Sequence, residues 1–286
     1  MPKLIEFTCK PERDFPVPYS DGYSLYSALL NQMSNYSPEK ADMVHDSGFS
    51  SISVSGLNGS FGGSERDNYK KLSGKEEYTF KVGVTAPEEK EVFQALIGPM
   101  VLEEEPIQLS KGELNIREVE SHSRSFNELV SESKEDLSKG VNSVGFEFTS
   151  PACIQYANSS VTEMFPHRIE VFNSVAGKWN QVCPEGMEVK FKKDDFGRNL
   201  IEKPVPESYQ THSVLVNRVY DENKGHRRPI FRQGFTGKCN YSFSGQEDAG
   251  FKEKVITLAR FSEYSGVGSA VARGCGSVKV NFKGNN

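Results

Sequence analysis

A segment near the C-terminus combines two features that let a loop bind phosphate. Residues 266–276 contain glycine at four positions: Gly266, Gly268, Gly274 and Gly276. Because glycine has no side chain, the peptide N–H groups of such a loop can approach an anion closely. Arg260, Arg273 and Lys279 add positive charge nearby in the sequence. Glycine is also typical of plain connecting loops, so the segment by itself leaves both a phosphate site and a connector open.

His45 is a candidate for proton transfer, because an imidazole side chain changes its charge near neutral pH. It follows a short predicted helix that begins with Ser37 as the N-cap and Pro38 at the first helical position. A histidine at the end of a helix also interacts favourably with the helix dipole, which leaves a purely structural role open. Three other histidines stand alone in strand-like or turn-like segments and are interpreted as structural residues: His122, His167 and His212.

The densest cluster of basic residues runs from His226 to Arg232 and includes Arg227 and Arg228, and Lys238 follows it. Guanidinium groups bind phosphate through paired hydrogen bonds and can read the edge of guanine. Charged residues at the end of a strand commonly just face solvent, and the cluster alone does not separate the two readings.

The composition is that of a globular protein without the sequence motif of a metal or nucleotide site. The chain has 286 residues, 11% of them aromatic, and a mean hydropathy of −0.54. Its five cysteines are scattered without a C-x-x-C pair, which predicts buried, reduced thiols. H-E-x-x-H, G-x-x-x-x-G-K-[ST] and G-x-S-x-G motifs are all missing from the sequence, so no cofactor is expected.

Charge and hydropathy limit where the protein acts and what it binds. The net charge of −5 argues against coating of nucleic acid over the whole surface, although it allows a local basic face. No apolar run approaches the ~18 residues of a membrane span, and the N-terminus lacks the apolar core of a signal peptide. We therefore expect a cytoplasmic protein that has no membrane partner.

Hydrophobic periodicity predicts the elements that would position these residues. In the first half, we expect strands at 3–9, 50–57, 77–84 and 113–123 and helices at 22–34 and 88–97. In the second half, we expect strands at 143–149, 209–220, 227–243 and 278–282 and helices at 165–179 and 251–261. Each half follows the ferredoxin-like order of strand, helix, strand, strand, helix, strand.

The predicted fold is therefore α+β, with two tandem ferredoxin-like (RRM-like) domains built on antiparallel sheets. The N-terminal domain is expected at 1–130 and carries His45, and the C-terminal domain is expected at 141–286 and carries the glycine-rich loop. The polar stretch 131–140 is predicted to be a linker.

Two such units with a glycine-rich loop before the last strand resemble the repeat-associated mysterious protein superfamily. Within it, the chain resembles the CRISPR-associated endoribonuclease that cuts repeat RNA into guides. The resemblance covers nearly the whole chain, and the order of its parts makes it specific. Besides the loop, these parts are Val17-Pro18-Tyr19, Val44-His45-Asp46, Phe148-Thr149-Ser150-Pro151, Phe165-Pro166 and Gly234-Phe235-Thr236-Gly237.

The resemblance implies metal-independent cleavage of CRISPR repeat RNA to mature guide RNAs. A ribose 2′-OH would attack the adjacent phosphate, which requires two proton transfers and positive charge near the phosphorane. The products would carry 2′,3′-cyclic phosphate and 5′-OH ends, and DNA would not be cut. The implied partners are repeat RNA, its guide product and an interference complex of the Cascade type, with the protein acting as a monomer or homodimer.

The resemblance also assigns roles to individual residues. His45 matches the histidine that family members carry after the first helix. Some members have a tyrosine late on that helix and a lysine about six residues after the histidine, where this chain has Leu30 and either Ser50 or Ser51. The candidate helpers for His45 are therefore Tyr26, Lys40 and Ser51. The predicted RNA contacts are Arg227, Arg228, Arg232, Lys238, Arg260, Gly266, Gly268, Ser269, Arg273, Gly274 and Gly276.

Two other functions stay open at this point. A non-catalytic RNA-binding subunit of a CRISPR effector complex would keep the arginines and the loop without needing His45. A protein-interaction module without an RNA role is favoured only by the net charge of −5.

Overall fold

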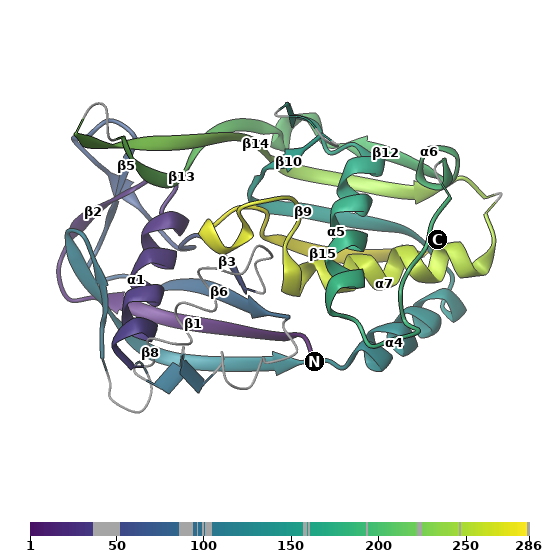
Figure 1. Ribbon diagram of the computed structural model, residues 1–286, viewed down its shortest axis with the longest axis horizontal. Coiled ribbons are helices and arrows are strands. Elements are labelled where there is room, and N and C mark those ends of the chain that lie inside the picture. The colour runs from purple at the N-terminus through teal and green to yellow at the C-terminus, as the bar shows by residue number, and fades with distance from the viewer. Residues whose placement is uncertain are drawn as a thin grey trace.

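The computed structural model places two antiparallel sheets side by side, each with helices packed against it (Figure 1). It describes residues 1–36, 52–85, 94–95, 97–98, 100, 105–156, 159, 161–192, 194–221, 225–245 and 247–284. His45, Lys40 and Ser51 lie outside the described residues, as does most of the helix expected at 88–97.

The N-terminal sheet has the strand order β3-β6-β1-β8-β7. Its strands are β1 (Lys3–Pro11), β3 (Ile52–Val54), β6 (Tyr78–Val84), β7 (Ile107–Leu109) and β8 (Gly112–Ser123). Helix α1 (Gly22–Tyr36) packs on this sheet through Leu25, Leu29 and Met33, which are all buried. Alternation along β1 points Ile5 and Phe7 into the same core. Four of these strands, in the sheet order β3-β6-β1-β8, have the ferredoxin-like arrangement that the sequence predicts.

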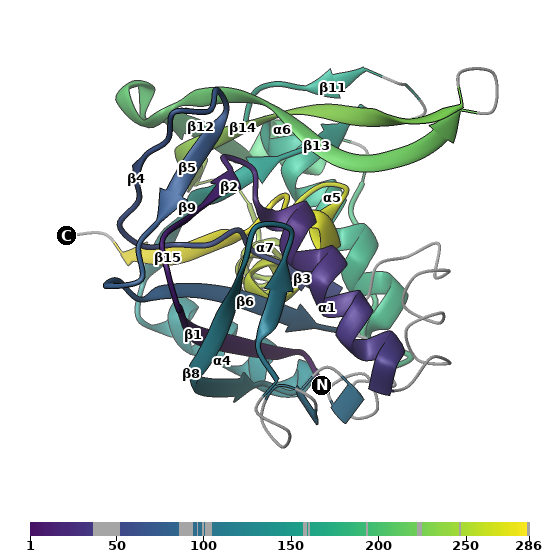
Figure 2. The same cartoon turned by 90° about the vertical axis from the view of Figure 1, so that its left-hand side faces the viewer.

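A small second sheet lies beside the N-terminal sheet (Figure 2). Its strands are β2 (Phe15–Pro18), β5 (Tyr69–Leu72) and β4 (Gly62–Gly63), in the order β2-β5-β4. The sequence analysis does not predict it, because its strands are short and rich in proline, lysine and glycine, which are depleted from strands. The sheet nevertheless matters for the site, because β5 carries Lys70.

The C-terminal sheet has the order β12-β14-β9-β15, and β13 pairs with β14. Its strands are β9 (Val141–Ala152), β12 (Leu200–Pro204), β13 (Gln210–Asp221), β14 (His226–Phe243) and β15 (Val278–Gly284). Helices α5 (Arg168–Val182) and α7 (Ala249–Ser265) bury Phe172, Trp179 and Phe261 against it. The remaining elements are β10 (Ile154–Gln155), β11 (Thr162–Glu163), α6 (Asp195–Asn199), η2 (Pro206–Ser208) and η3 (Val271–Arg273). The tandem ferredoxin-like fold is therefore confirmed.

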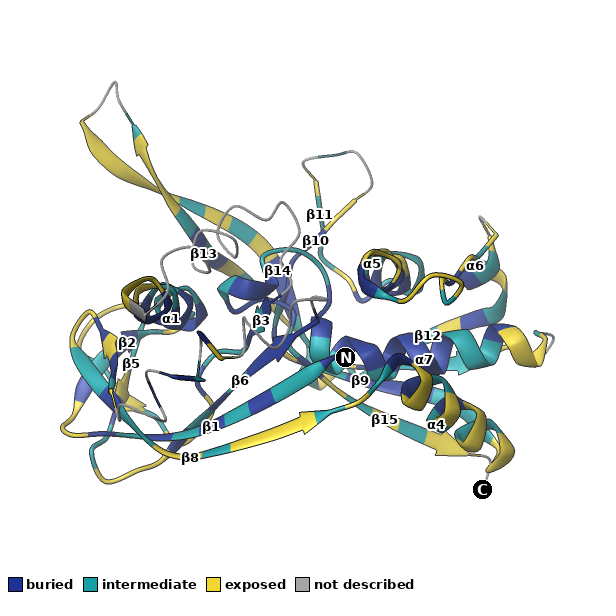
Figure 3. Ribbon diagram, turned by 60° about the horizontal axis from the view of Figure 1, so that its bottom comes forward, coloured by how far each residue is buried: buried dark blue, intermediate teal, exposed yellow. Residues whose placement is uncertain are grey.

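One predicted strand has a different role from the one expected. The second strand of the C-terminal ferredoxin unit is β12, whereas the segment 209–220 forms β13. Strands β13 and β14 build a long hairpin whose far end projects from the body of the protein (Figure 3). Arg227 and Arg228 pair with Tyr220 and Val219 near that end, and all four are exposed. The predicted basic cluster thus lies on a projecting arm.

The predicted linker at 131–140 is wrong, because helix α4 (Phe126–Ser138) occupies most of it. Ser125 and Glu128 form a capping box at its start. Phe126 meets Trp179 at a ring-centroid distance of 5.0 Å, and Ser133 accepts a hydrogen bond from Thr257 on α7. The helix is therefore part of the C-terminal core, and the limits of the two domains stay a prediction.

Two further expectations concern the cysteines and the membrane. All five cysteines are free, and all except Cys183 are buried, as predicted. Among the described residues, no helix combines the length and the apolar character needed to span a bilayer.

Candidate functional site

A pocket of about 310 Å³ opens between the two halves of the chain and is termed the central pocket. The N-terminal half contributes the start of α1, the turn at Gly56 and Leu57, and Lys70 from β5. The C-terminal half contributes the end of β9, the base of the β13–β14 hairpin and the segment around Arg273. Elements far apart in the sequence therefore share one polar cavity.

The close approach of Gly22 and Gly274 brings α1 to the glycine-rich loop. A Cβ atom on Gly22 would lie 2.3 Å from the Cα of Gly274, and a Cβ on Gly274 would lie 2.4 Å from the Cα of Gly22. Because real Cβ atoms do not approach other carbons so closely, both positions require glycine. The contact places the guanidinium carbon of Arg273 at 5.9 Å from the ring centroid of Tyr26.

Asp21 fixes the N-terminal wall of the central pocket. Its carboxylate is buried, accepts the Leu57 N–H at 3.0 Å and lies 2.9 Å from the Lys70 ammonium group. Burial raises the pKa of Asp21, and the charge of Lys70 opposes that shift. The ion pair therefore ties the start of α1 to β5 and holds Lys70 at the pocket.

His212, which the sequence pattern suggests to be a structural residue, lines the central pocket. Its Nε2 atom lies 2.8 Å from the Thr236 Oγ1 atom, across the base of the hairpin. The ring is half-buried, and this burial lowers the pKa of His212 below its usual value of 6.5. The imidazole is therefore uncharged at neutral pH.

The four glycines of the loop serve the packing of the loop itself. All four have positive φ, and Gly266, Gly274 and Gly276 are buried. Their N–H groups donate to the Ser262 carbonyl, the Ser174 hydroxyl, the Val271 carbonyl and the Pro151 carbonyl, in chain order. The expected cradle of phosphate-binding amides is therefore not supported, because these amides already have acceptors inside the protein.

The prediction that Arg260 contacts RNA is also not supported. Its guanidinium group donates to Asp136 at 3.0 Å and to Glu132 at 2.9 Å, both on α4, and it lies over the ring of Phe282. Its charge is thus satisfied within the C-terminal core. Arg260 is close to the glycine-rich loop in sequence, but its side chain faces α4 and β15.

The other predicted RNA contacts are spread along the hairpin and the loop. Arg232 is half-buried and donates to the Ser269 hydroxyl at 3.1 Å, and that hydroxyl donates to the Cys153 carbonyl. Lys238 is exposed and lies 3.5 Å from Glu147. Of the predicted RNA contacts, Arg273 and Gly274 line the central pocket, whereas Arg227 and Arg228 lie farther out on the arm.

Tyr26 is poorly suited to proton transfer at this site. Its side chain is only 9% exposed, and burial raises its pKa. A buried phenol with a raised pKa gives up its proton reluctantly, so Tyr26 fits better as a support for Arg273.

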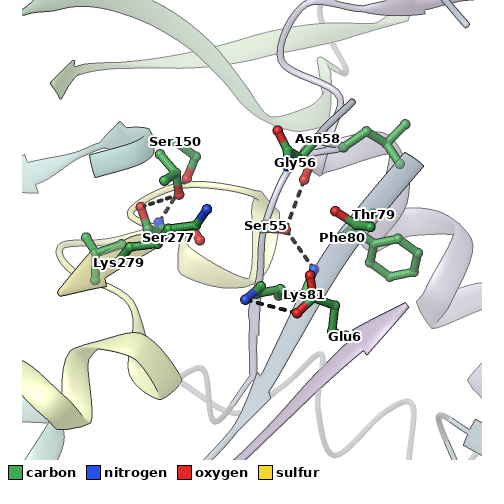
Figure 4. A pocket seen from close by; sticks show the side chains of 13 residues that line it. Glu6, Ser55, Gly56, Asn58, Thr79, Phe80, Lys81, Ser150, Ser277 and Lys279 are labelled. Atoms are coloured by element: carbon green, nitrogen blue, oxygen red, sulfur yellow. Dashed lines mark hydrogen bonds and ion pairs between the residues drawn. The ribbon is translucent and has the colours of Figure 1, made fainter. Parts of the chain in front are cut away.

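A second, adjoining pocket of about 140 Å³ extends the cavity between the two sheets (Figure 4). It shares Gly56, Leu57, Thr149 and Ser150 with the central pocket. Its walls carry the ion pair between Lys81 and Glu6 (3.1 Å), together with Ser55, Ser277 and Lys279. The two pockets therefore adjoin, and their walls carry charged and hydroxyl side chains that can form hydrogen bonds to a ligand.

One family model matches the C-terminal half of the chain. Residues 146–278 match the model of the family CRISPR-associated endoribonuclease Cas6. This match agrees with the family that the sequence resembles. A search of curated protein sequences finds no match.

Solved structures of this family share the fold over the full chain. A product complex of Thermus thermophilus Cas6 is 16% identical, with a TM-score of 0.69 and coverage of 98% of this chain and 99% of the other. A Cas6-related protein from Pyrococcus furiosus is 12% identical, with a TM-score of 0.63 and the same coverage. A third structure, described as an RAMP protein binding different RNA substrates, is 13% identical, with a TM-score of 0.61 and again the same coverage.

Proposed function

We propose that this protein is a metal-independent endoribonuclease that cleaves CRISPR repeat RNA to mature guide RNAs. The family match and the two-domain fold support the processing of repeat RNA. The central pocket is the observation that carries the proposal, because both halves of the chain line it and it gathers cationic groups at one end of α1. Products with 2′,3′-cyclic phosphate and 5′-OH ends are part of the proposal.

The electrostatics of the central pocket suit a phosphodiester. The first N–H groups of a helix lack partners within the helix and form the positive end of its dipole, and here that end of α1 lines the pocket. Arg273 adds a full positive charge on the facing wall. A phosphorane that forms between them would have its developing negative charge stabilised by groups that are already in place.

His45 is proposed as one proton-transfer residue, on the basis of its match to the family pattern. Lys40 and Ser51 stay proposals for helper roles on the same basis. Arg227 and Arg228 on the projecting arm are proposed to bind the flank or stem of the repeat, where bidentate contacts to phosphate or guanine are possible. The guide RNA either stays bound afterwards or passes to a Cascade-type interference complex.

The test is cleavage of the cognate repeat RNA in EDTA, with a control RNA that carries a single 2′-deoxyribose at the cleavage position. We expect the all-ribose RNA to be cut and the modified RNA to be bound but left intact, because the nucleophile is removed. His45→Ala should abolish cleavage while leaving the RNA Kd unchanged. Binding of both RNAs without any cleavage would instead support the non-catalytic subunit, and a metal requirement would contradict the mechanism.

A further inference from the structure

Cleavage by a ribose 2′-OH needs two proton transfers, one from the attacking hydroxyl and one to the departing 5′-oxygen. The proposed function, on which this inference rests, assigns one such group, His45. Tyr26 is buried behind Arg273 and does not fill the second role well. The described part of the chain offers a different candidate in the central pocket.

We propose that His212 is a second catalytic residue, which accepts the proton of the attacking ribose 2′-OH. In this step the 2′-oxygen forms a bond to phosphorus, its proton moves to the imidazole, and the bond from phosphorus to the 5′-oxygen breaks. The departing 5′-oxygen takes its proton from a general acid, which is the role proposed for His45. The cyclic phosphate and the 5′-OH then leave with all protons accounted for.

His212 lies in the same pocket as the groups that are proposed to stabilise the phosphate. His212 and Arg273 line the same cavity as the first residue of α1, Gly22. Tyr19, which is 70% exposed just before α1, also lines this cavity and can stack on a base. A nucleotide in the central pocket would therefore have its phosphate near the positive groups and its ribose within the same small volume as the imidazole.

The hydrogen bond to Thr236 orients the imidazole ring. When Nε2 donates its proton to the Thr236 hydroxyl, 2.8 Å away, the unprotonated Nδ1 atom is the one that can accept a proton. Both residues sit on paired strands at the base of the hairpin, which is a rigid support.

The charge state of His212 also fits the role of a base. Burial lowers its pKa, so the imidazole is mostly unprotonated at neutral pH. The other titratable groups that line the central pocket among the described residues are Tyr19, Asp21, Lys70 and Arg273. Asp21 and Lys70 form an ion pair with each other, and burial is the cause of the lowered pKa of His212.

The test measures single-turnover cleavage and RNA affinity separately for His212→Gln, His212→Ala and Thr236→Val. We expect both His212 variants to lose roughly 10²- to 10⁴-fold in cleavage rate while Kd stays within about threefold. Thr236→Val should lose less, since it removes the orienting hydroxyl but leaves the base. His122→Gln is the matched control, because His122 is 60% exposed on β8, outside the central pocket, and it should cleave at the wild-type rate.

Two further readouts separate catalysis from a structural role. The wild-type rate should rise with pH as His212 loses its proton, below pH 6.5, and His212→Gln should lack this limb of the profile. Added imidazole should restore part of the activity of His212→Ala, because the cavity of about 310 Å³ is lined by the residues that held the ring. Thermal melting confirms that each variant is folded.

The outcomes are distinguishable from failure of the proposed function. If the wild-type protein binds repeat RNA without cutting it, the endoribonuclease proposal fails and this one fails with it. If the wild-type protein cuts and His212→Gln cuts equally fast, only the role of His212 is overturned. A variant that loses affinity and rate by the same factor would also overturn it, since His212 would then be a binding residue.

Discussion

Gly274→Ala tests whether the contact between α1 and the glycine-rich loop builds the site. Gly274 has a φ of +86°, and a methyl group there would lie 2.4 Å from the Cα of Gly22. Left-handed backbone costs an alanine roughly 1–2 kcal/mol, and overpacking against main chain adds roughly 1–3 kcal/mol. We therefore expect the free energy of unfolding to fall by about 2–5 kcal/mol.

The same substitution should also impair RNA processing beyond its effect on stability. Relief of the clash requires α1 and the loop to separate, which moves Arg273 away from the start of the helix and divides the cationic groups of the central pocket. Chemical denaturation followed by circular dichroism gives the stability, and single-turnover cleavage at a temperature where the variant is folded gives the rate. We expect the rate to fall at least tenfold under those conditions.

Gly177→Ala is the matched control, because it adds the same methyl group to an exposed position in the middle of α5 where nothing lies within 4 Å. It should raise the free energy of unfolding by roughly 0.5–1 kcal/mol through the better helix propensity of alanine, without changing cleavage. A Gly274→Ala protein as stable and as active as the wild type would refute the reasoning, since the close contact would then not constrain the site.

Arg260→Ala should affect stability alone, whereas the double variant Arg227→Ala with Arg228→Ala should affect RNA binding alone. Arg260→Ala should lower the free energy of unfolding by roughly 1–3 kcal/mol without changing the RNA Kd, because it leaves Glu132 and Asp136 without their shared partner. The double variant should weaken RNA binding and reduce its salt dependence without lowering the free energy of unfolding. The reverse pattern, with Arg260 needed for binding and the two arm arginines needed for stability, would contradict the structure. Lys178 is half-buried, donates to the carbonyls of Ser265 and Gly266, and has its pKa lowered by desolvation to about 7. The unfolded chain binds this proton up to about pH 10.5, so stability should rise with pH from about 7 to 9 by at most ~1.4 kcal/mol per pH unit, and Lys178→Met should lose that slope in pH-dependent denaturation.

Periodicity predicts the strands and helices that carry the two cores, because those elements bury one face along their whole length. β1, α1 and α7 show this pattern clearly. β12 is not predicted, since it is short, mostly polar and ends at Pro204. α4 is mistaken for a linker because most of its surface is polar, yet Ser125 and Glu128 already form the signature of a capping box before Leu129. That signal was available in the sequence.

The site itself is harder to predict, because its members come from separate parts of the chain. His212 has no informative neighbour in the sequence, and its relevance depends on Thr236, Arg273 and the start of α1 meeting in one pocket. Arg260 shows the converse: its proximity to the loop in sequence is misleading, because one turn of a helix decides which side a residue faces. Residue type identifies candidates, but only the topology decides which of them share a cavity.

The glycine-rich loop illustrates how this assembly works. Gly274 allows the start of α1 to approach closely, and the Gly268 amide donates to the Ser174 hydroxyl on α5. The Ser269 hydroxyl accepts a hydrogen bond from Arg232 of the hairpin and donates one to the Cys153 carbonyl after β9. The loop thus connects four elements through short, partly buried contacts, which argues against a flexible flap that closes over RNA. Its glycines let main chains meet and thereby fix the position of Arg273, whose charge is the one proposed to bind phosphate. A substitution in the loop should therefore affect RNA cleavage through the geometry of the central pocket even where the altered residue does not touch RNA.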